Sequence, residues 1–158
     1  MAIHFFDYSI PVKNAIDEQV AKFLEEAGGL VESKAKDNTR VDSGATRKLW
    51  SHVVQGNKCT IGNPFENAIW EEFGTGEHSA KGRKGGWWIP AWKLDNRTRY
   101  VLENKYHFKK RYGKRGRAYY YTEGKKGTQA FEKAFDSSKP LIEKRAKEIF
   151  GELNKKWF

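Results

Sequence analysis

The sequence predicts an α+β fold, and three observations lead to this prediction. Apolar residues recur at helical spacing near both ends of the 158-residue chain. Short strand-like segments lie between the two helical patterns. After residue 76 the chain becomes basic, aromatic and rich in glycine for about fifty residues. A chain of this length is expected to form one domain, residues 1–158, in which residues 77–126 are an extended basic and aromatic arm.

The first helical pattern predicts a long helix over residues 12–37. Residues 1–10 are apolar and expected to be extended, and Pro11 suits the first turn of a helix. Apolar side chains from Ala15 to Val31 then follow with the spacing of one helix face. Gly28 and Gly29 each weaken a helix by about 1 kcal/mol relative to alanine, which indicates either a kink or a place where another backbone packs closely.

A short helical turn and two strands are expected next. Asp42 or Ser43 can cap a helical turn that runs to about Leu49. Residues 50–54 and 58–62 have strand character, and Gly56-Asn57 is a good pair for the tight hairpin turn between them.

The segment Asn67–Gly76 is the sharpest change of character in the chain. Its apolar members predict a packed element, and the two glycines around Thr75 predict a tight exit from it. A phosphate-binding loop is the other interpretation. It is disfavoured because the strand, glycine-rich loop, Lys-Ser/Thr and helix pattern of such loops does not follow.

The arm concentrates positive charge. Fifteen lysines and arginines between residues 81 and 126 are opposed only by Asp95, Glu103 and Glu123. Strand character at residues 87–89 and 118–122 predicts a long β-hairpin, with a flexible tip at residues 109–117. The residues that we expect to contact a partner or DNA are Lys109, Lys110, Arg111, Lys114, Arg115 and Arg117.

Two functional interpretations of this arm stay open. Lysine and arginine neutralise phosphates, and aromatic rings can stack on exposed bases, as nucleic-acid binding requires. Tryptophan, tyrosine and arginine are also the residues enriched in protein interfaces, which favours a subunit contact as the main role. The net charge of +10 agrees with an anionic partner in either case.

The last part of the chain predicts a helix with an apolar stripe from Phe131 to Leu153. Pro140 interrupts the stripe and predicts a kink or a fresh helix start. Trp157-Phe158 is expected either to pack back on the protein or to anchor to a partner.

Residues that would carry enzymatic chemistry do not form a coherent pattern. Glu71 and Glu72 are adjacent and would point apart on a helix, and the four histidines lack metal-ligand spacing. Cys59 is expected to be a small buried residue rather than a nucleophile for His52. We therefore expect no enzyme, metal or cofactor. No apolar run approaches the roughly 20 residues that span a bilayer, and the start does not resemble a signal peptide, so a cytoplasmic product without membrane contact is expected.

An ordered set of segments resembles the tail-completion, or head–tail joining, proteins of long-tailed bacteriophages. Val41–Arg47 is similar to the family's Val-Asp-Thr-Gly-x-Leu-Arg, and Thr60-Ile61-Gly62 to its Val-x-Val-Gly. Ala68–Gly76 resembles its Tyr-Ala-x-Tyr-Val-Glu-Phe-Gly-Thr-Gly, and Gly127–Phe131 with the final helix resembles its ending. The departures are Ala45-Thr46, a long middle loop and a missing Pro-Phe-Leu-Pro before the last helix. The signature residues are Val41, Asp42, Ser43, Gly44, Trp70, Glu72, Phe73, Gly74, Thr75 and Gly76.

The resemblance covers residues 12–153 and implies both a fold and a role. The fold would be a small α+β subunit, with a long N-terminal helix and a C-terminal helix packed on an antiparallel sheet. The role would be structural: copies form a ring in the virion neck, assembled in the host cytoplasm, that completes the tail end and joins it to the head connector. DNA would pass through the ring. The partners would be the subunit itself and the neighbouring neck, connector and tail proteins.

Overall fold

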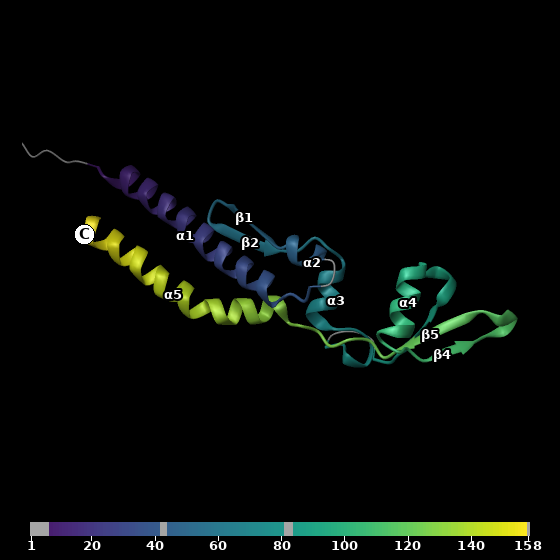
Figure 1. The fold of residues 1–158 in the computed structure, drawn as a ribbon. Helices are drawn as coiled ribbons and strands as arrows, with labels where there is room; N and C mark the ends of the chain where they lie inside the picture. Colours follow the sequence, from purple (N-terminus) through teal and green to yellow (C-terminus); the bar gives the residue numbers. More distant parts are fainter. Residues whose placement is uncertain (1–6, 42–43, 81–83, 158) are drawn as a thin grey trace, which may run out of the picture. The chain divides into compact units, whose positions relative to one another are not determined.

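A computed structural model describes residues 7–41, 44–80 and 84–157 and has the predicted α+β fold (Figure 1). Its contacts divide the chain into two compact units, which are described separately. Residues 1–68 and 129–158 form what we call the helical unit, and residues 69–128 form the sheet unit. The segment predicted as an arm, residues 77–126, lies within the sheet unit. A single domain over residues 1–158 stays a prediction.

The helical unit is built on two long helices, α1 (Ser9–Asn38) and α5 (Ala130–Trp157). They lie side by side and run in opposite directions, as Figure 1 shows. Short helix α2 (Ala45–Lys48) and the antiparallel hairpin of β1 (Ser51–Gln55) and β2 (Lys58–Gly62) pack on α1. This arrangement confirms the predicted packing of the two helices with an antiparallel sheet.

The core of the helical unit joins α1 and α5 with β2 and with Trp50, which precedes β1. Its buried side chains are Val31, Ala35, Trp50 and Ala134. The indole of Trp50 stacks on Phe131 with ring centroids 5.7 Å apart. Its Nε1–H donates to Thr39 Oγ1 over 2.9 Å, so the polar end of this large apolar side chain is satisfied inside the core.

Helix α1 confirms the predicted helix and extends it at the N-terminal end. Ser9 and Ile10 belong to it, so the expected extended conformation is wrong at these two residues. The carboxylate of Asp7 accepts the free amide of Ser9 over 2.8 Å, and Pro11 lies in the first turn, where its missing N–H costs no helical bond. Residues 1–6 of the expected extended segment lie outside the described residues.

Gly28 is a close-packing position of α1. A Cβ atom added there would lie 2.6 Å from His52 Cδ2 and 2.7 Å from Cys59 Sγ. The predicted close neighbour therefore exists, but it consists of two side chains of the β1–β2 hairpin rather than a backbone. Cys59 is partly buried against α1, and this burial raises the pKa of its thiol.

The predicted hairpin is confirmed, whereas the predicted cap of α2 is not described. Gln55 pairs with Lys58 across the turn, and Gly56 has a φ of +60°. The N-cap of α2 is Gly44, which has a φ of +79° and makes no side-chain hydrogen bond. Asp42 and Ser43, the expected capping residues, lie outside the described residues.

The sheet unit holds a three-stranded antiparallel sheet in the order β3–β5–β4. Its strands are β3 (Trp87–Pro90), β4 (Lys110–Tyr112) and β5 (Ala118–Thr122). The two strands of the predicted hairpin do pair with one another, as β3 and β5. The predicted flexible tip is partly wrong, because Lys110–Tyr112 form the strand β4, which pairs with the other edge of β5. The 3₁₀ turns are η1 (Gly76–His78), η2 (Ala91–Lys93) and η3 (Lys114–Gly116).

Two further helices contribute to the sheet unit. Helix α3 (Asn67–Phe73) leads into it and holds the signature residues Trp70, Glu72 and Phe73. Helix α4 (Asn96–Asn104) was not predicted. Asp95 caps α4 by accepting the amide of Thr98 over 2.9 Å and its hydroxyl over 2.6 Å.

Helix α5 continues through Pro140, so the predicted interruption is a proline inside one helix and not a second helix start. Figure 1 shows that α5 changes direction along its course. Proline cannot donate the backbone bond of its turn, which is a sufficient cause for a bend. None of the helices in the described part of the chain is both long and apolar enough to cross a membrane.

Candidate interaction surfaces

The Gly74-Thr75-Gly76 signature forms one side of a close backbone crossing. We call residues 74–77 and 123–127 the glycine crossing. The amide of Thr75 donates to the carbonyl of Lys125, and that of Glu77 to the carbonyl of Glu123, both over 2.8 Å. The amide of Lys125 donates back to Thr75 Oγ1 over 3.0 Å. The threonine of the signature therefore ties the two segments together through both its backbone and its hydroxyl.

Glycine is required in the crossing because the backbones leave no room for a side chain. Gly74 and Gly76 have φ of +74° and +59°, and Gly124 has a φ of +92°. A Cβ at Gly74 would lie 2.7 Å from the amide nitrogen of Gly127, and one at Gly124 would lie 2.5 Å from the carbonyl carbon of Thr75. The tight exit predicted after Phe73 is thus confirmed.

The crossing also bears on the phosphate-loop interpretation. In a phosphate loop, backbone amides point free at the ligand. Here the amides of Thr75 and Glu77 are bonded across the crossing, and those of Gly74, His78 and Ser79 donate to local carbonyls. These five N–H groups therefore have partners within the sheet unit, and the arrangement supports the structural interpretation of the signature.

A cavity of about 790 Å³ opens beside the crossing. Its walls include the indoles of Trp70 and Trp87, which are 49% and 43% exposed, and backbone of the two glycine-rich turns. Lys84 Nζ lies at its lining and donates to the carbonyl of Ser79 over 2.6 Å. The described lining is therefore mainly apolar with one cation, whose ammonium already has a carbonyl partner.

One face of the three-stranded sheet is covered by α4. Tyr120 on this face is 1% exposed and donates its hydroxyl to Glu103 of α4. Lys110 Nζ lies 2.6 Å from the same carboxylate, which lowers the pKa of Glu103 and raises that of Lys110. Burial is the main cause that raises the pKa of the Tyr120 hydroxyl. The cation of this face is thus neutralised by a carboxylate.

The opposite face, which we call the open face, carries Trp88, Arg111, Tyr119 and Tyr121. Trp88 pairs with Tyr121, and Arg111 with Tyr119, so strand alternation places all four on one side. The guanidinium carbon of Arg111 lies 4.0 Å from the centroid of the Trp88 ring. Trp92 of η2 meets the edge of Tyr119 with centroids 5.0 Å apart, and Arg117 Cζ lies 5.1 Å from the Trp92 centroid.

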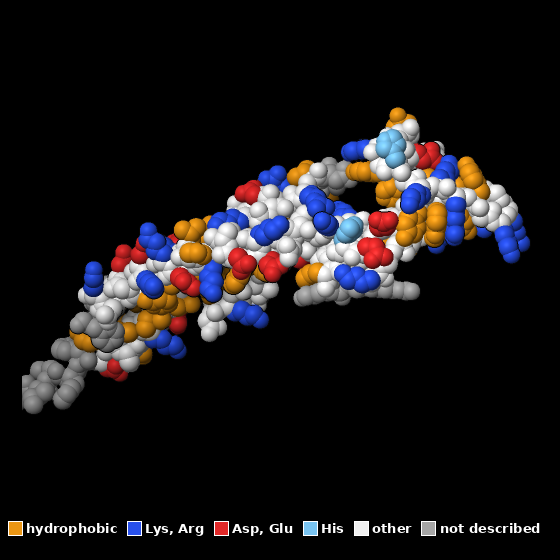
Figure 2. Space-filling view, turned by 90° about the horizontal axis from the view of Figure 1, so that it is seen from below, with side chains coloured by type: hydrophobic (Ala, Val, Ile, Leu, Met, Phe, Trp, Pro, Cys, Tyr) orange, Lys and Arg blue, Asp and Glu red, His pale blue; other side chains and the backbone are white. Residues whose placement is uncertain are grey.

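The charge of the chain is concentrated in the sheet unit. Residues 69–128 hold 15 of the 30 lysines and arginines but only 6 of the 20 acidic residues, so their net charge is +9 and that of the remainder is +1. Figure 2 shows basic side chains alternating with hydrophobic ones over the end that holds β4 and β5. An anionic surface is therefore the electrostatic complement of this unit.

The six predicted contact residues of the arm do not share one environment. Lys110 is paired with Glu103 on the covered face. Arg111 and Arg117 lie over the rings of the open face. Lys114 and Arg115 are exposed in η3, where Arg115 has a φ of +68°, and Lys109 is exposed before β4.

The signature residues of the family fall in both units. Val41 is 60% exposed and Gly44 is the N-cap of α2, whereas Asp42 and Ser43 lie outside the described residues. Trp70 lines the cavity, Glu72 and Phe73 belong to α3, and Gly74, Thr75 and Gly76 make the glycine crossing.

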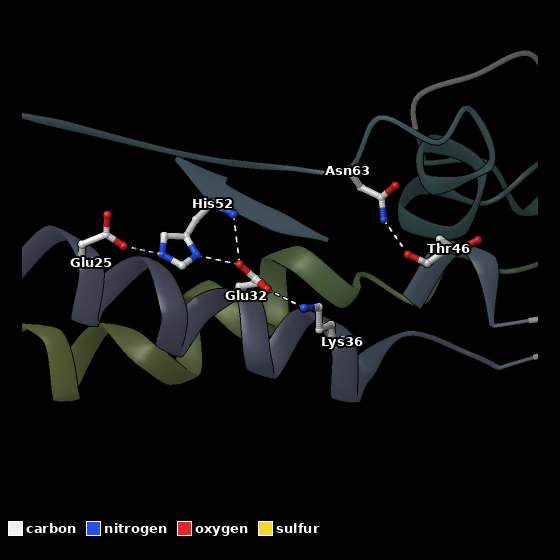
Figure 3. A network of polar contacts seen from close by, with 6 residues as sticks. All are labelled: Glu25, Glu32, Lys36, Thr46, His52 and Asn63. Carbon is white, nitrogen blue, oxygen red and sulfur yellow. Dashed lines mark hydrogen bonds and ion pairs between the residues drawn. The ribbon is translucent and has the colours of Figure 1, made fainter. Parts of the chain in front are cut away.

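A separate polar cluster in the helical unit attaches the hairpin to α1 (Figure 3). His52 Nδ1 lies 2.6 Å from Glu32 Oε2, and its Nε2 lies 3.0 Å from Glu25 Oε2. The bond to Glu32 is the main cause that raises the pKa of His52, and Lys36, which also contacts Glu32, is the main cause that lowers the pKa of that carboxylate. Asn63 donates to the carbonyl of Thr46 over 2.6 Å and so ties the end of the hairpin to α2.

The structure places no group of three or more His, Cys, Asp or Glu side chains in a metal-binding arrangement within the part of the chain it describes. No protein-family model matches the chain, and no curated protein or solved structure matches it either. The resemblance to the phage neck family therefore depends on the segments quoted above and stays a prediction.

Sequence reasoning missed three features of the structure. The sequence did contain a signal for helix α4. Asp95 is a favoured N-cap residue, and Thr98 lies three positions later, where the backbone amide donates to the cap. The division of the aromatic residues between two faces also had a signal, since Tyr119 and Tyr121 alternate with Tyr120 in a strand. The carboxylate cluster around His52 had none, because Glu25 and Glu32 are 27 and 20 residues away from it along the chain.

Proposed function

We propose that this chain is a structural subunit of the neck of a long-tailed bacteriophage, where copies form a ring that completes the tail and joins it to the head connector. The resemblance of residues 12–153 supports this proposal. So does the fold, since two long helices pack together with a small antiparallel hairpin, as the resemblance implies. The glycine crossing adds that the most specific signature segment has an architectural role.

The observation that carries the proposal is the amount of large apolar surface left exposed on the helices. On α5, Leu141 and Phe135 are 51% and 48% exposed. On α1, Ile10 and Ile16 are also exposed. Large apolar side chains that stay exposed on the single chain are candidates for burial in an assembly. A ring of identical subunits needs two different contact patches on each copy, and each helix offers apolar residues for one.

The proposal is tested by deleting the gene from its phage and supplying it from a plasmid. The expected phenotype without the gene is DNA-filled heads beside separate tails in electron micrographs of the lysate, and the wild-type plasmid should restore joined particles. Leu141→Glu places a charge on the exposed apolar surface of α5 and should fail to restore joining. Leu141→Met keeps the surface apolar and should restore it.

Measurements on the purified variants separate a lost contact from a failure to fold. Leu141 is half exposed, so Leu141→Glu is expected to fold, with the same circular dichroism and thermal midpoint as the wild type. Infectious, joined particles from the deletion strain would overturn the neck proposal. Joined particles with Leu141→Glu would overturn the assignment of this surface of α5 to the ring contact.

A further inference from the structure

We propose that the open face of the sheet unit binds the phosphate backbone of duplex DNA through Arg111 and Arg117, whose guanidinium groups are held in place by the rings of Trp88 and Trp92. This inference does not depend on the neck role, because it is tested on the purified chain. Binding would be confined to one face of the sheet and to two arginines that contact aromatic rings.

The first argument is that the cations of the two faces have different partners. On the covered face, Lys110 Nζ lies 2.6 Å from the carboxylate of Glu103. On the open face, Arg111 and Arg117 contact aromatic rings, and among the described residues neither has a carboxylate within ion-pair distance. Their charges are thus available to an external anion, whereas that of Lys110 is not.

The second argument is that aromatic rings hold the two guanidinium groups in place before DNA binds. A ring beneath a guanidinium attracts the cation and leaves the N–H edges free to donate in the plane of the group. Arg111 Cζ lies 4.0 Å from the Trp88 centroid, and Arg117 Cζ lies 5.1 Å from the Trp92 centroid. Because these long side chains are already ordered, binding loses less conformational entropy than it would with free arginines.

The third argument is the spacing of the two arginines. Arg111 pairs with Tyr119, and the amide of Gly113 donates to the carbonyl of Arg117, so the two arginines are diagonal neighbours across β4 and the start of β5. Diagonal positions of an antiparallel pair are about 7–8 Å apart, within reach of the phosphates of one DNA strand. The net charge of +9 on this unit supplies the long-range attraction.

The occupied rings favour phosphate contacts over base stacking. Base stacking needs an open aromatic face, as in single-strand-binding proteins. Here the guanidinium of Arg111 lies over the ring of Trp88, which also packs against Tyr121 with centroids 5.0 Å apart. The guanidinium of Arg117 lies over the ring of Trp92, which makes an edge contact with Tyr119. The open face therefore fits the outside of a duplex better than unpaired bases.

The test is a fluorescence-anisotropy titration of the full chain with a mixed-sequence duplex of about 20 base pairs at several salt concentrations. Arg111→Gln with Arg117→Gln should weaken binding by roughly tenfold or more at about 100 mM salt and lower the salt slope by about 2, since each phosphate contact contributes about 0.9 to the slope. Arg97→Gln with Lys105→Gln removes the same charge from α4 and its C-cap, and should change affinity no more than about threefold. Equal losses in the two double variants would leave only net charge and overturn the proposal.

Two further variants separate the stacked geometry from charge alone. Arg111→Lys with Arg117→Lys keeps both charges but loses the planar group, and should bind clearly more weakly than the wild type. Trp92→Leu releases Arg117 from its ring and should weaken binding by roughly two- to tenfold without changing the salt slope. A lysine variant that binds as well as the wild type would overturn the role of stacking.

The choice of nucleic acid is tested by two competitors. A single strand of the same sequence should compete no better than the duplex, and polyglutamate of equal charge should compete more weakly. A strong preference for the single strand that is lost in Trp92→Leu would show base stacking instead. Equal competition by polyglutamate would point to an acidic protein, and either result would overturn the proposal, as would the absence of binding at about 50 mM salt.

Discussion

His52 Nδ1 lies 2.6 Å from Glu32 Oε2, and the backbone amide of His52 donates to the same oxygen over 3.0 Å. This relationship joins β1 to α1 by a hydrogen bond that becomes an ion pair when the imidazole is protonated. Both side chains are largely buried, with 19% of each exposed. The bond therefore makes the stability of the helical unit depend on pH.

The first prediction concerns that dependence. The pKa of His52 is raised by Glu32, so its contribution is complete below the unfolded histidine pKa of about 6.5 and is lost as pH rises through the folded value. The pKa of Glu32 is lowered, so its contribution is complete above about 4.5 and is lost as pH falls through the folded value. Both contributions are complete between these limits.

His52→Gln should therefore cost the most stability in that window. We expect a loss of about 1–2 kcal/mol in the free energy of unfolding at about pH 5.5, and a smaller loss at about pH 8.5, because the ion pair weakens as pH rises through the raised pKa of His52. Urea unfolding at the two pH values measures the difference. His78→Gln, at an exposed histidine of the sheet unit, serves as the control. An equal loss at both pH values would contradict the ion pair.

The second prediction uses the neighbouring glycines of α1. Gly29→Ala should stabilise the chain by about 0.5–1 kcal/mol, because alanine favours the helix and the nearest side-chain atom to the new Cβ is His52 Cε1 at 3.8 Å. Gly28→Ala should destabilise it by about 1–3 kcal/mol, because the same methyl group would clash with His52 and Cys59. The denaturation midpoints of the two variants, compared with that of the wild type, test this prediction. Midpoints that shift in the same direction in both variants would contradict the close packing at Gly28.

Local sequence patterns predicted some features of this fold but not the contacts between distant segments. The spacing of apolar residues predicted both long helices, and Gly56-Asn57 predicted the β1–β2 turn, because these features depend on neighbours a few residues away. The crowding at Gly28 comes from a hairpin about thirty residues later, which no local pattern contains. For the same reason the arm was predicted as one basic surface, although Glu103 of the unpredicted α4 neutralises Lys110 and divides it into two faces.

The third prediction concerns the glycine crossing. Gly124 and Gly116 both have positive φ, +92° and +67°. An added Cβ meets nothing within 4 Å at Gly116, but lies 2.5 Å from the carbonyl carbon of Thr75 at Gly124. Gly116→Ala should thus cost only the strain of a left-handed alanine, about 1–2 kcal/mol, whereas Gly124→Ala should cost at least about 1–3 kcal/mol more.

Hydrogen exchange of the sheet unit measures this pair of variants. In Gly124→Ala the amides of Thr75 and Glu77 should lose protection, since they donate across the crossing. In Gly116→Ala they should keep it. Unchanged protection in Gly124→Ala would mean that the two segments do not hold one another in place.

The last prediction concerns Ser138 of α5, which is completely buried and whose Oγ has no hydrogen-bond partner among the described residues. An unpaired buried hydroxyl costs about 1–3 kcal/mol, and alanine is also the better helix former. Ser138→Ala should therefore raise the free energy of unfolding by about 1 kcal/mol or more. Ser137→Ala is the matched control, because Ser137 is exposed and donates to the carbonyl of Ala134 over 3.2 Å, so its loss and its gain in helix propensity should nearly cancel. A Ser138→Ala variant less stable than the wild type would show that its hydroxyl has a partner in solution, such as water held at the bend of α5.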